Sequence, residues 1–166
     1  TVKKTFTYRF NKVRDYKMSE QSVNIVKLAV GIQSVEELAL IQRRFLNQLK
    51  GQTSKGFYHS TKLMPKKHDA IVESGSLYWV IKGVICARQK IVEIIKQEDP
   101  DGIKRCRIYL EDSIIKTTPI RKRPFQGWRY LKKNKTPADI IDPITGTFDD
   151  DIPLDVQRQL LEVGLL

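Results

Sequence analysis

One stretch of 21 residues, SLYWVIKGVICARQKIVEIIK (76–96), constrains the fold most strongly. Its β-branched and aromatic residues are typical of strands, but it is well beyond the roughly 5–6 residues of a typical strand. Gly83 lies inside it, and a glycine within a strand pattern indicates a bulge or a sharp bend. The stretch therefore predicts one ribbon that turns a corner at Gly83, as strands do in small barrels.

Further strand patterns lie on both sides of this stretch. They are SVNIVKLAVG (22–31), FYHSTKLM (57–64), IKRCRIYLE (103–111) and IIKTTPI (114–120). The third follows the turn signal DPDG (99–102) and places Cys106, Ile108 and Leu110 on one face. Five or six strands with one main helix predict an α+β fold with a mostly antiparallel sheet, either open or closed into a small barrel.

The main helix is expected to follow the first strand and to cover the sheet. Ser34 and Glu37 form a capping box, and Gly51 supplies a stop signal. Between them, apolar residues recur at helical spacing: Leu38, Ile41, Phe45 and Leu49. A shorter helix is predicted for residues 66–74, closed by Gly75.

The formal charge of +11 is divided unevenly along the chain. Residues 1–135 carry 29 basic and 12 acidic residues, whereas residues 136–166 carry one basic and seven acidic residues. A strongly basic body favours nucleic acid or another polyanion over a small neutral substrate, although such charge also serves solubility. The longest apolar runs are far shorter than the ~20 residues of a membrane helix, which predicts no membrane span.

These patterns divide the chain into three parts. Residues 1–21 form a basic N-terminal arm, residues 22–135 an α+β core domain, and residues 136–166 an acidic tail in which a short helix is expected. The arm begins TVKKTFTYRFNKVR, with five Lys or Arg and no acidic residue. Such a segment is typical of the neighbourhood of a mitochondrial targeting sequence, of a nucleic-acid-binding arm or of a shortened chain.

Residue types that commonly carry catalysis or bind metals occur without a recognised arrangement. Cys86 and Cys106 lie singly in apolar stretches, which predicts reduced core residues in a reducing compartment. The spacing of His59 and His68 fits no standard metal motif, and no metal or cofactor is predicted. GxSxG, Walker and GxGxxG motifs do not occur in the sequence, so no catalytic residue is assigned.

Four stretches together resemble one family: VKLAVGIQSVEEL, GSLYWVIKGVICARQKI, GIKRC and RPFQGWRYLK. They are similar to domain-of-unknown-function family 1489, which is known mainly from short proteins of alphaproteobacteria, over roughly residues 22–139. The resemblance implies that the basic arm and the acidic tail from about residue 140 are additions to an older core. An alphaproteobacterial core with a basic extension implies a mitochondrial homologue.

A fainter similarity concerns the order of the elements. A helix over a small sheet, with IVESG before a basic strand that carries Lys82 and Arg88, is similar to the PUA-like and ASCH-like barrels. Members of that group engage RNA or modified nucleotides. The similarity implies a small PUA-like β-barrel with one main covering helix.

The densest cationic segment is RKRPFQGWRYLKK (121–133), with six Lys or Arg, three aromatic residues and no acidic residue. Arg and Lys bind phosphate, and aromatic rings stack on bases. The predicted nucleic-acid-binding residues are Arg121, Lys122, Arg123, Arg129, Lys132 and Lys133, together with Lys82 and Arg88. Phe125 and Trp128 either stack on bases or plug the domain at a Pro and Gly turn, whereas Trp79 is predicted to lie in the core.

The function expected first is that of a non-enzymatic RNA-associated protein. It would be a mitochondrial ribosomal protein or ribosome-assembly partner in the matrix, with the basic body on rRNA and the arm and tail on neighbouring proteins. One alternative is an enzyme acting on a nucleotide or modified base, in which Lys82 or Arg88 would converge on a carboxylate. The others are an interaction subunit of another mitochondrial complex and, for location, the bacterial cytoplasm.

Overall fold

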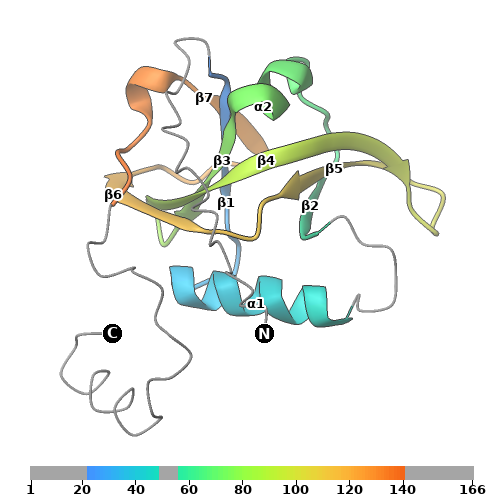
Figure 1. Ribbon diagram of the computed structural model, residues 1–166, viewed down its shortest axis with the longest axis horizontal. Helices are drawn as coiled ribbons and strands as arrows, with labels where there is room; N and C mark the ends of the chain where they lie inside the picture. The colour runs from blue at the N-terminus through green and yellow to red at the C-terminus, as the bar shows by residue number, and fades with distance from the viewer. Residues whose placement is uncertain (1–21, 49–55, 141–166) are drawn as a thin grey trace, which may run out of the picture.

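The computed structural model describes residues 22–48 and 56–140, which form seven strands and two α-helices (Figure 1). Their order is β1 (Asn24–Leu28), α1 (Val35–Gln48), β2 (Tyr58–Thr61), α2 (His68–Ser74), β3 (Ser76–Ile81), β4 (Val84–Glu98), β5 (Lys104–Leu110), β6 (Ile115–Arg121) and β7 (Trp128–Leu131), followed by a short 3-10 helix at Lys133–Lys135. The predicted α+β class is confirmed. The basic arm, the end of the predicted main helix at Leu49 and Gly51, and the tail from residue 141 lie outside the described residues.

The strands form one mixed sheet with the order β2-β5-β4-β3-β1-β7. β1 and β3 are parallel, and the other pairs are antiparallel. β5 and β6 follow one another along β4, since β5 pairs with its second half and β6 with its first. The sheet is mostly antiparallel, as predicted, but it is open, because no backbone ladder joins β2 to β7 in the described part.

Gly83 does not bend a single ribbon, so that prediction is wrong. Lys82 (φ 49°) and Gly83 (φ 75°) form a two-residue turn between β3 and β4, which places Ile81 opposite Val84. Two successive positive φ values are characteristic of the type I′ turn that favours tight hairpins. The irregularities lie instead along the ladders of β4, where the register shifts against β3, β5 and β6.

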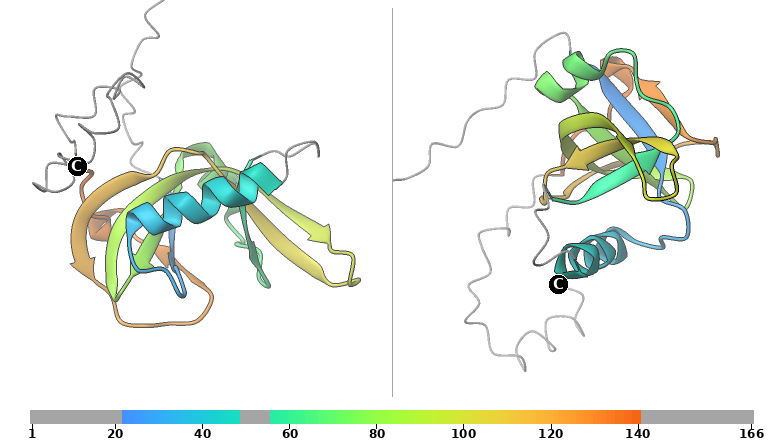
Figure 2. Two further views of the ribbon diagram at one scale, coloured as in Figure 1. Left: turned by 90° about the horizontal axis from the view of Figure 1, so that it is seen from below. Right: turned by 90° about the vertical axis from the view of Figure 1, so that its right-hand side faces the viewer.

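The two faces of the sheet bury two separate apolar clusters. The larger cluster contains Ile25, Leu77 and Trp79 and is covered by α1, which lies along one side of the sheet (Figures 1 and 2). Trp79 is 2% exposed, which confirms it as a core residue. The smaller cluster lies on the opposite face and contains Val26, Tyr78, Val80, Ile85 and Leu131, with Phe125 packed against it.

α1 begins with the predicted capping box, and its buried face departs from the predicted one at Ile41, while Phe45 packs against Phe57 and Tyr58 as expected of a covering helix. The Ser34 hydroxyl accepts from the Glu37 N–H at 3.1 Å, and the Glu37 carboxylate accepts from the Gln33 N–H at 2.5 Å. Leu38 is buried as predicted, but the next buried position is Gln42, while Ile41 is 40% exposed. The face of the helix that meets the sheet therefore includes a polar side chain.

A buried amide network explains this position. The Gln42 and Gln89 side-chain amides pair reciprocally at 2.8 Å, although 47 residues separate them. The Gln89 oxygen also accepts from the Trp79 indole at 2.8 Å, and its nitrogen donates to the Glu111 carbonyl at 2.9 Å. Since every donor and acceptor of the Gln89 amide is used, its burial carries little cost and fixes α1 on the sheet.

The short helix predicted for residues 66–74 is α2, and it ends against β1. Gly75 donates its N–H to the Ile71 carbonyl at 2.6 Å, and β3 begins at the next residue. A Cβ at this position would lie 2.1 Å from the Val23 carbonyl oxygen. The close approach of the two backbones therefore requires glycine.

Residues 136–140 pack on the core rather than leave it. The Thr118 N–H donates to the Ala138 carbonyl at 2.8 Å, and the Ile140 N–H donates to the Lys116 carbonyl at 2.9 Å. An isolated bridge also pairs Thr117 with Asp139. These contacts attach the first residues of the predicted acidic tail to β6.

Candidate nucleic-acid interface

Four predicted cations meet at one end of the sheet. β6 pairs with β4 so that Arg121 lies opposite Val84, directly beside the β3–β4 turn. The Lys122 N–H donates to the Gly83 carbonyl at 2.8 Å, which fixes the start of the RKR segment against the turn. The backbone therefore gathers a group that we call the turn cluster: Lys82, Arg121, Lys122 and Arg123.

The turn cluster carries charge that the described protein does not neutralise. Lys82, Arg121 and Arg123 are exposed, and Lys122 is half-buried. Within residues 22–48 and 56–140, none of the four forms an ion pair. The Lys122 ammonium instead lies 5.9 Å from the centre of the Phe125 ring.

Phe125 and Arg129 extend this surface. Phe125 packs against the smaller core cluster, and the Arg129 guanidinium lies 5.5 Å from its ring centre. Arg129 also donates to the Gln126 and Trp128 carbonyls at 2.8 and 2.9 Å. Phe125 therefore packs into the smaller core cluster, and its ring also contacts the cationic groups of Lys122 and Arg129.

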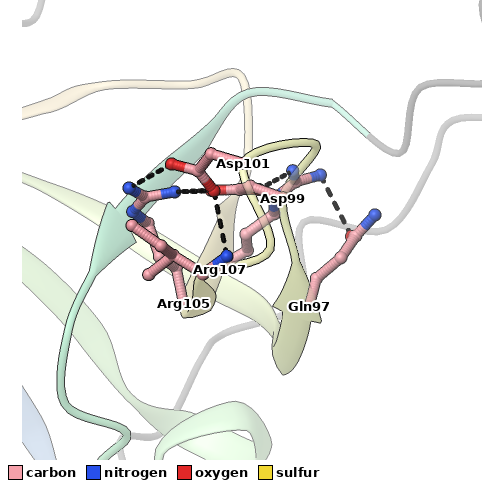
Figure 3. A network of polar contacts seen from close by, with 6 residues as sticks. Gln97, Asp99, Asp101, Arg105 and Arg107 are labelled. Atoms are coloured by element: carbon pink, nitrogen blue, oxygen red, sulfur yellow. Dashed lines mark hydrogen bonds and ion pairs between the residues drawn. The ribbon is translucent and has the colours of Figure 1, made fainter.

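At the opposite end of the sheet, a second group of arginines is neutralised by ion pairs with carboxylates. The β4–β5 hairpin extends beyond the rest of the sheet (Figure 1). At its tip Arg105 pairs with Asp99 at 2.5 Å and with Asp101 at 2.8 Å, and Arg107 pairs with Asp99 (Figure 3). The predicted turn at residues 99–102 is confirmed, since the Gly102 N–H donates to the Asp99 carbonyl at 2.8 Å. Arg107 and Arg105 lower the pKa of Asp99 by hydrogen bonding.

Arg88 is joined to a carboxylate. Its guanidinium donates to both oxygens of Asp139 at 2.6 Å and to the Ser76 hydroxyl at 3.2 Å. Asp139 raises the pKa of Arg88 through these bonds. Arg88 therefore converges on a carboxylate, as the enzyme alternative requires, and the pair also holds residues 136–140 against β4.

Lys132 and Lys133 lie apart from the turn cluster. β7 runs antiparallel to β1, with Trp128 opposite Lys27 and Leu131 opposite Asn24. The two lysines follow Leu131 and so lie at the far end of β7. The structure therefore divides the predicted set into the turn cluster with Arg129, the distant pair of lysines, and the ion-paired Arg88.

A cavity that the sequence did not predict lies between the end of β2 and β7. Its volume is about 920 Å³. The lining residues are Lys27, Ser60, Thr61, Lys62, Leu63, Gln126, Gly127, Trp128, Arg129 and Tyr130. These include three cationic residues and no carboxylate. The available sequence signal was Lys27, a single cation within the apolar strand SVNIVKLAVG.

Trp128 lines this cavity and also joins β7 to the segment that follows β2. Its indole donates to the Leu63 carbonyl at 2.9 Å, and the same carbonyl accepts from the Thr61 hydroxyl at 2.9 Å. The Tyr130 ring lies edge-on to it, with 5.0 Å between ring centres. Side-chain contacts thus bridge the gap between β2 and β7 that no backbone ladder closes.

Lys27 and His59 lie together at the inner side of this gap. Burial lowers the pKa of Lys27, whose ammonium contacts the Gly127 carbonyl at 3.5 Å. Burial and then the charge of Lys27 lower the pKa of His59 to about 4, so His59 is neutral at pH 7. The His59 Nε2 is buried without a hydrogen-bond partner among the described residues, and its ring lies edge-on to Trp79 at 5.7 Å.

Other reactive side chains form no recognisable site in the described part. Cys106 is a buried core residue, as predicted, whereas Cys86 is half-buried against the core. Burial raises the pKa of both thiols, which keeps them protonated at neutral pH. Residues 22–48 and 56–140 contain no group of three or more His, Cys, Asp or Glu that could hold a metal ion. The His68 Nδ1 lies 2.9 Å from the Oδ1 of the neighbouring Asp69.

The two α-helices in the described part are both too short or too polar to span a bilayer.

Comparisons with known proteins place the chain in one family. Neither the curated proteins nor the solved structures gave a match. A family model does match, over residues 25–166, and this range includes the acidic tail. The expectation that the tail from about residue 140 is an addition to the family core is therefore wrong, whereas residues 1–21 precede the match. The chain belongs to the family described as "Protein of unknown function (DUF1489)".

Proposed function

We propose that this protein binds RNA through the turn cluster as a non-enzymatic RNA-associated protein. The observation that carries the proposal is the lack of ion pairs at Lys82, Arg121 and Arg123 in the described part, although they are exposed and close together. Cations grouped beyond the reach of carboxylates gain most from phosphates, because binding releases counterions from the nucleic acid. The basic composition of residues 1–135 favours the same partner.

The setting proposed for this activity is the mitochondrial ribosome or its assembly, in the matrix. The basic arm and the alphaproteobacterial character of the resembling family support this setting. The turn cluster would contact rRNA, and the oppositely charged tail would contact neighbouring proteins. Location in a bacterial cytoplasm is the alternative for a homologue with the same surface.

Purification of the native protein from its source tests this function. It should sediment with ribosomal particles and leave them after ribonuclease treatment. A variant with Lys82→Asn, Arg121→Gln, Lys122→Gln and Arg123→Gln should remain folded but sediment free of the particles. Asparagine is chosen at position 82 because it tolerates the positive φ of the turn. Co-purification that resists ribonuclease would favour an interaction subunit of another complex instead.

A second candidate function is an enzyme that acts on a nucleotide or modified base in a PUA-like pocket. The cavity between β2 and β7 favours it, since the half-buried Lys27 lines the cavity and its charge lowers the pKa of His59, which lies behind the lining residues and is neutral at pH 7. The catalytic pair would then be Lys27 and His59 rather than Lys82 or Arg88. Turnover of a nucleotide that is lost in both Lys27→Met and His59→Gln would establish this activity, and its absence would leave RNA binding.

A further inference from the structure

We propose that the cavity between β2 and β7 is a subsite for a single nucleotide of the bound RNA, with its base beside Trp128 and its phosphate at Lys27. This inference rests on the proposed function, because it names the part of the RNA that enters the protein. The turn cluster holds the RNA backbone from outside. The cavity adds a contact to one base.

The chemistry of the lining points to a ligand that is both aromatic and anionic. Trp128 and Tyr130 supply rings, while Lys27 and Lys62 supply positive charge. The volume of about 920 Å³ lies within the range of roughly 300–1,000 Å³ that is usual for sites of small ligands. Stacking of a base on an aromatic ring stabilises binding by about 1–3 kcal/mol.

Lys27 is the feature that the fold alone does not account for. It extends from a strand whose neighbours Ile25 and Val26 are fully buried, and it is itself half-buried. Its ammonium has one long contact, to the Gly127 carbonyl at 3.5 Å, and no ion pair within the described ranges. A partly desolvated ammonium without a counter-ion is stabilised by a bound phosphate.

The rim of the cavity exposes apolar surface that a base would cover. Leu63 is 73% exposed and Tyr130 is 44% exposed, and both line the opening. Trp128 is held in place by its hydrogen bond to the Leu63 carbonyl and by its edge-on contact with the Tyr130 ring. The site is therefore preorganised, which lowers the entropy lost when a ligand binds.

Arg129 lies on β7, the last strand in the sheet order, and its backbone borders the cavity. Because Arg129 pairs with Val26, its guanidinium lies on the face of the smaller cluster, over the same Phe125 ring that the Lys122 ammonium approaches. One RNA strand can therefore follow the cations from Lys122 to Arg129 and cross the edge of the sheet at β7, with a nucleotide in the cavity. An acidic peptide would satisfy the cations but not the aromatic wall, so a nucleotide is the better fit.

Calorimetric titration of the full chain at low salt tests the subsite. The probes are uridine and adenosine 5′-monophosphates, with uridine, ribose 5-phosphate and a polyglutamate peptide as comparisons. A mononucleotide should bind at one site, and its base and phosphate halves alone should bind at least about tenfold more weakly. Lys27→Met, which keeps the length of the side chain, should weaken the mononucleotide by about tenfold or more. The turn-cluster variant should keep its mononucleotide affinity.

The outcomes separate this inference from the proposed function. Equal mononucleotide affinity of the wild type and Lys27→Met, or no mononucleotide binding by a wild type that binds RNA, overturns the subsite and leaves the function. Mononucleotide binding that depends on Lys27, without RNA binding, overturns the function and leaves a site for free nucleotides. Stronger binding of polyglutamate overturns the ligand class. Should Lys27→Met fail to fold, Lys62→Gln, at an exposed lining residue, replaces it.

Discussion

The two ends of the sheet carry similar sequences with opposite consequences. KRCR (104–107) begins β5 directly after the β4–β5 turn, and RKR (121–123) follows the end of β6 beside the β3–β4 turn. At the hairpin tip, Asp99 and Asp101 pair with Arg105 and Arg107 (Figure 3). At the turn cluster no carboxylate in the described part pairs with the cations. A run of arginines therefore indicates a binding surface only where the fold keeps acidic residues away from it.

The largest expected effect lies between the two ends, in the amide network that holds α1 on the sheet. Gln89→Leu leaves the Trp79 indole, the Gln42 amide and the Glu111 carbonyl without their partner. The free energy of unfolding should fall by about 3–5 kcal/mol, because each buried unsatisfied group costs about 1–3 kcal/mol. Urea unfolding measures this difference.

The same substitution at the hairpin end is the control. Gln97 is exposed and accepts a hydrogen bond from Arg107 at 3.0 Å. Gln97→Leu should change the free energy of unfolding by less than about 0.5 kcal/mol. Equal losses for the two variants would contradict this expectation, since the buried network would then stabilise the fold no more than the exposed hairpin contact does.

Acid should loosen the cavity end before the hairpin end. The pKa of His59 is lowered to about 4, below its usual 6.5, so the unfolded chain binds the proton first. Stability is therefore fully present above about pH 6.5 and falls as the pH decreases towards 4, by up to about 3 kcal/mol. The hairpin carboxylates have lowered pKa values and stay paired through this range.

Unfolding measured at several pH values between 4.5 and 7 checks this difference. His59→Gln should remove most of the pH dependence in this window. An unchanged pH dependence in that variant would assign it to other groups. Residue-resolved hydrogen exchange at pH 5 should show faster opening of β2 than of the β4–β5 hairpin.

The smallest effects on stability and RNA affinity are expected from one Arg→Met substitution at each end of the sheet. Arg107→Met removes the ion pair to Asp99 and the stacking of the guanidinium on Tyr58 at 4.5 Å, so it should lower the midpoint of urea unfolding slightly. RNA affinity should stay within about twofold, because this cation is already neutralised. Arg123→Met should do the reverse, weakening RNA binding and leaving the unfolding midpoint unchanged. The same response to both substitutions would erase the distinction between the two ends.

Features set by neighbouring residues could be predicted from the sequence. The Ser34 and Glu37 box, the turn at residues 99–102 and the buried face of β5 depend on local pattern, and all three are confirmed. The turn at Gly83 was misread because a glycine between strand patterns is equally compatible with a bend and with a hairpin. Its conformation depends on whether β3 and β4 pair with each other.

The candidate site was predicted less completely because it depends on distant segments. The cavity brings Lys27 together with Gly127, which lies 100 residues further along the chain. Gln42 is buried because Gln89 meets it across 47 residues. The sequence identified the cations of RKRPFQGWRYLKK but could not assign Asp139 to Arg88 or separate Lys132 and Lys133 from the turn cluster. These partners are fixed by strand pairing, which composition does not reveal.

The salt dependence of RNA binding tests the central claim most directly. The turn-cluster variant removes four cations, and the plot of log affinity against log salt concentration should lose about 3 units of slope relative to the wild type. A control variant removes four exposed cations elsewhere, at Arg43, Arg44, Lys96 and Lys104, each changed to Gln. This control should keep the wild-type slope. Equal losses of slope in the two variants would contradict the account, since RNA would then respond to the net charge of the body and not to the turn cluster.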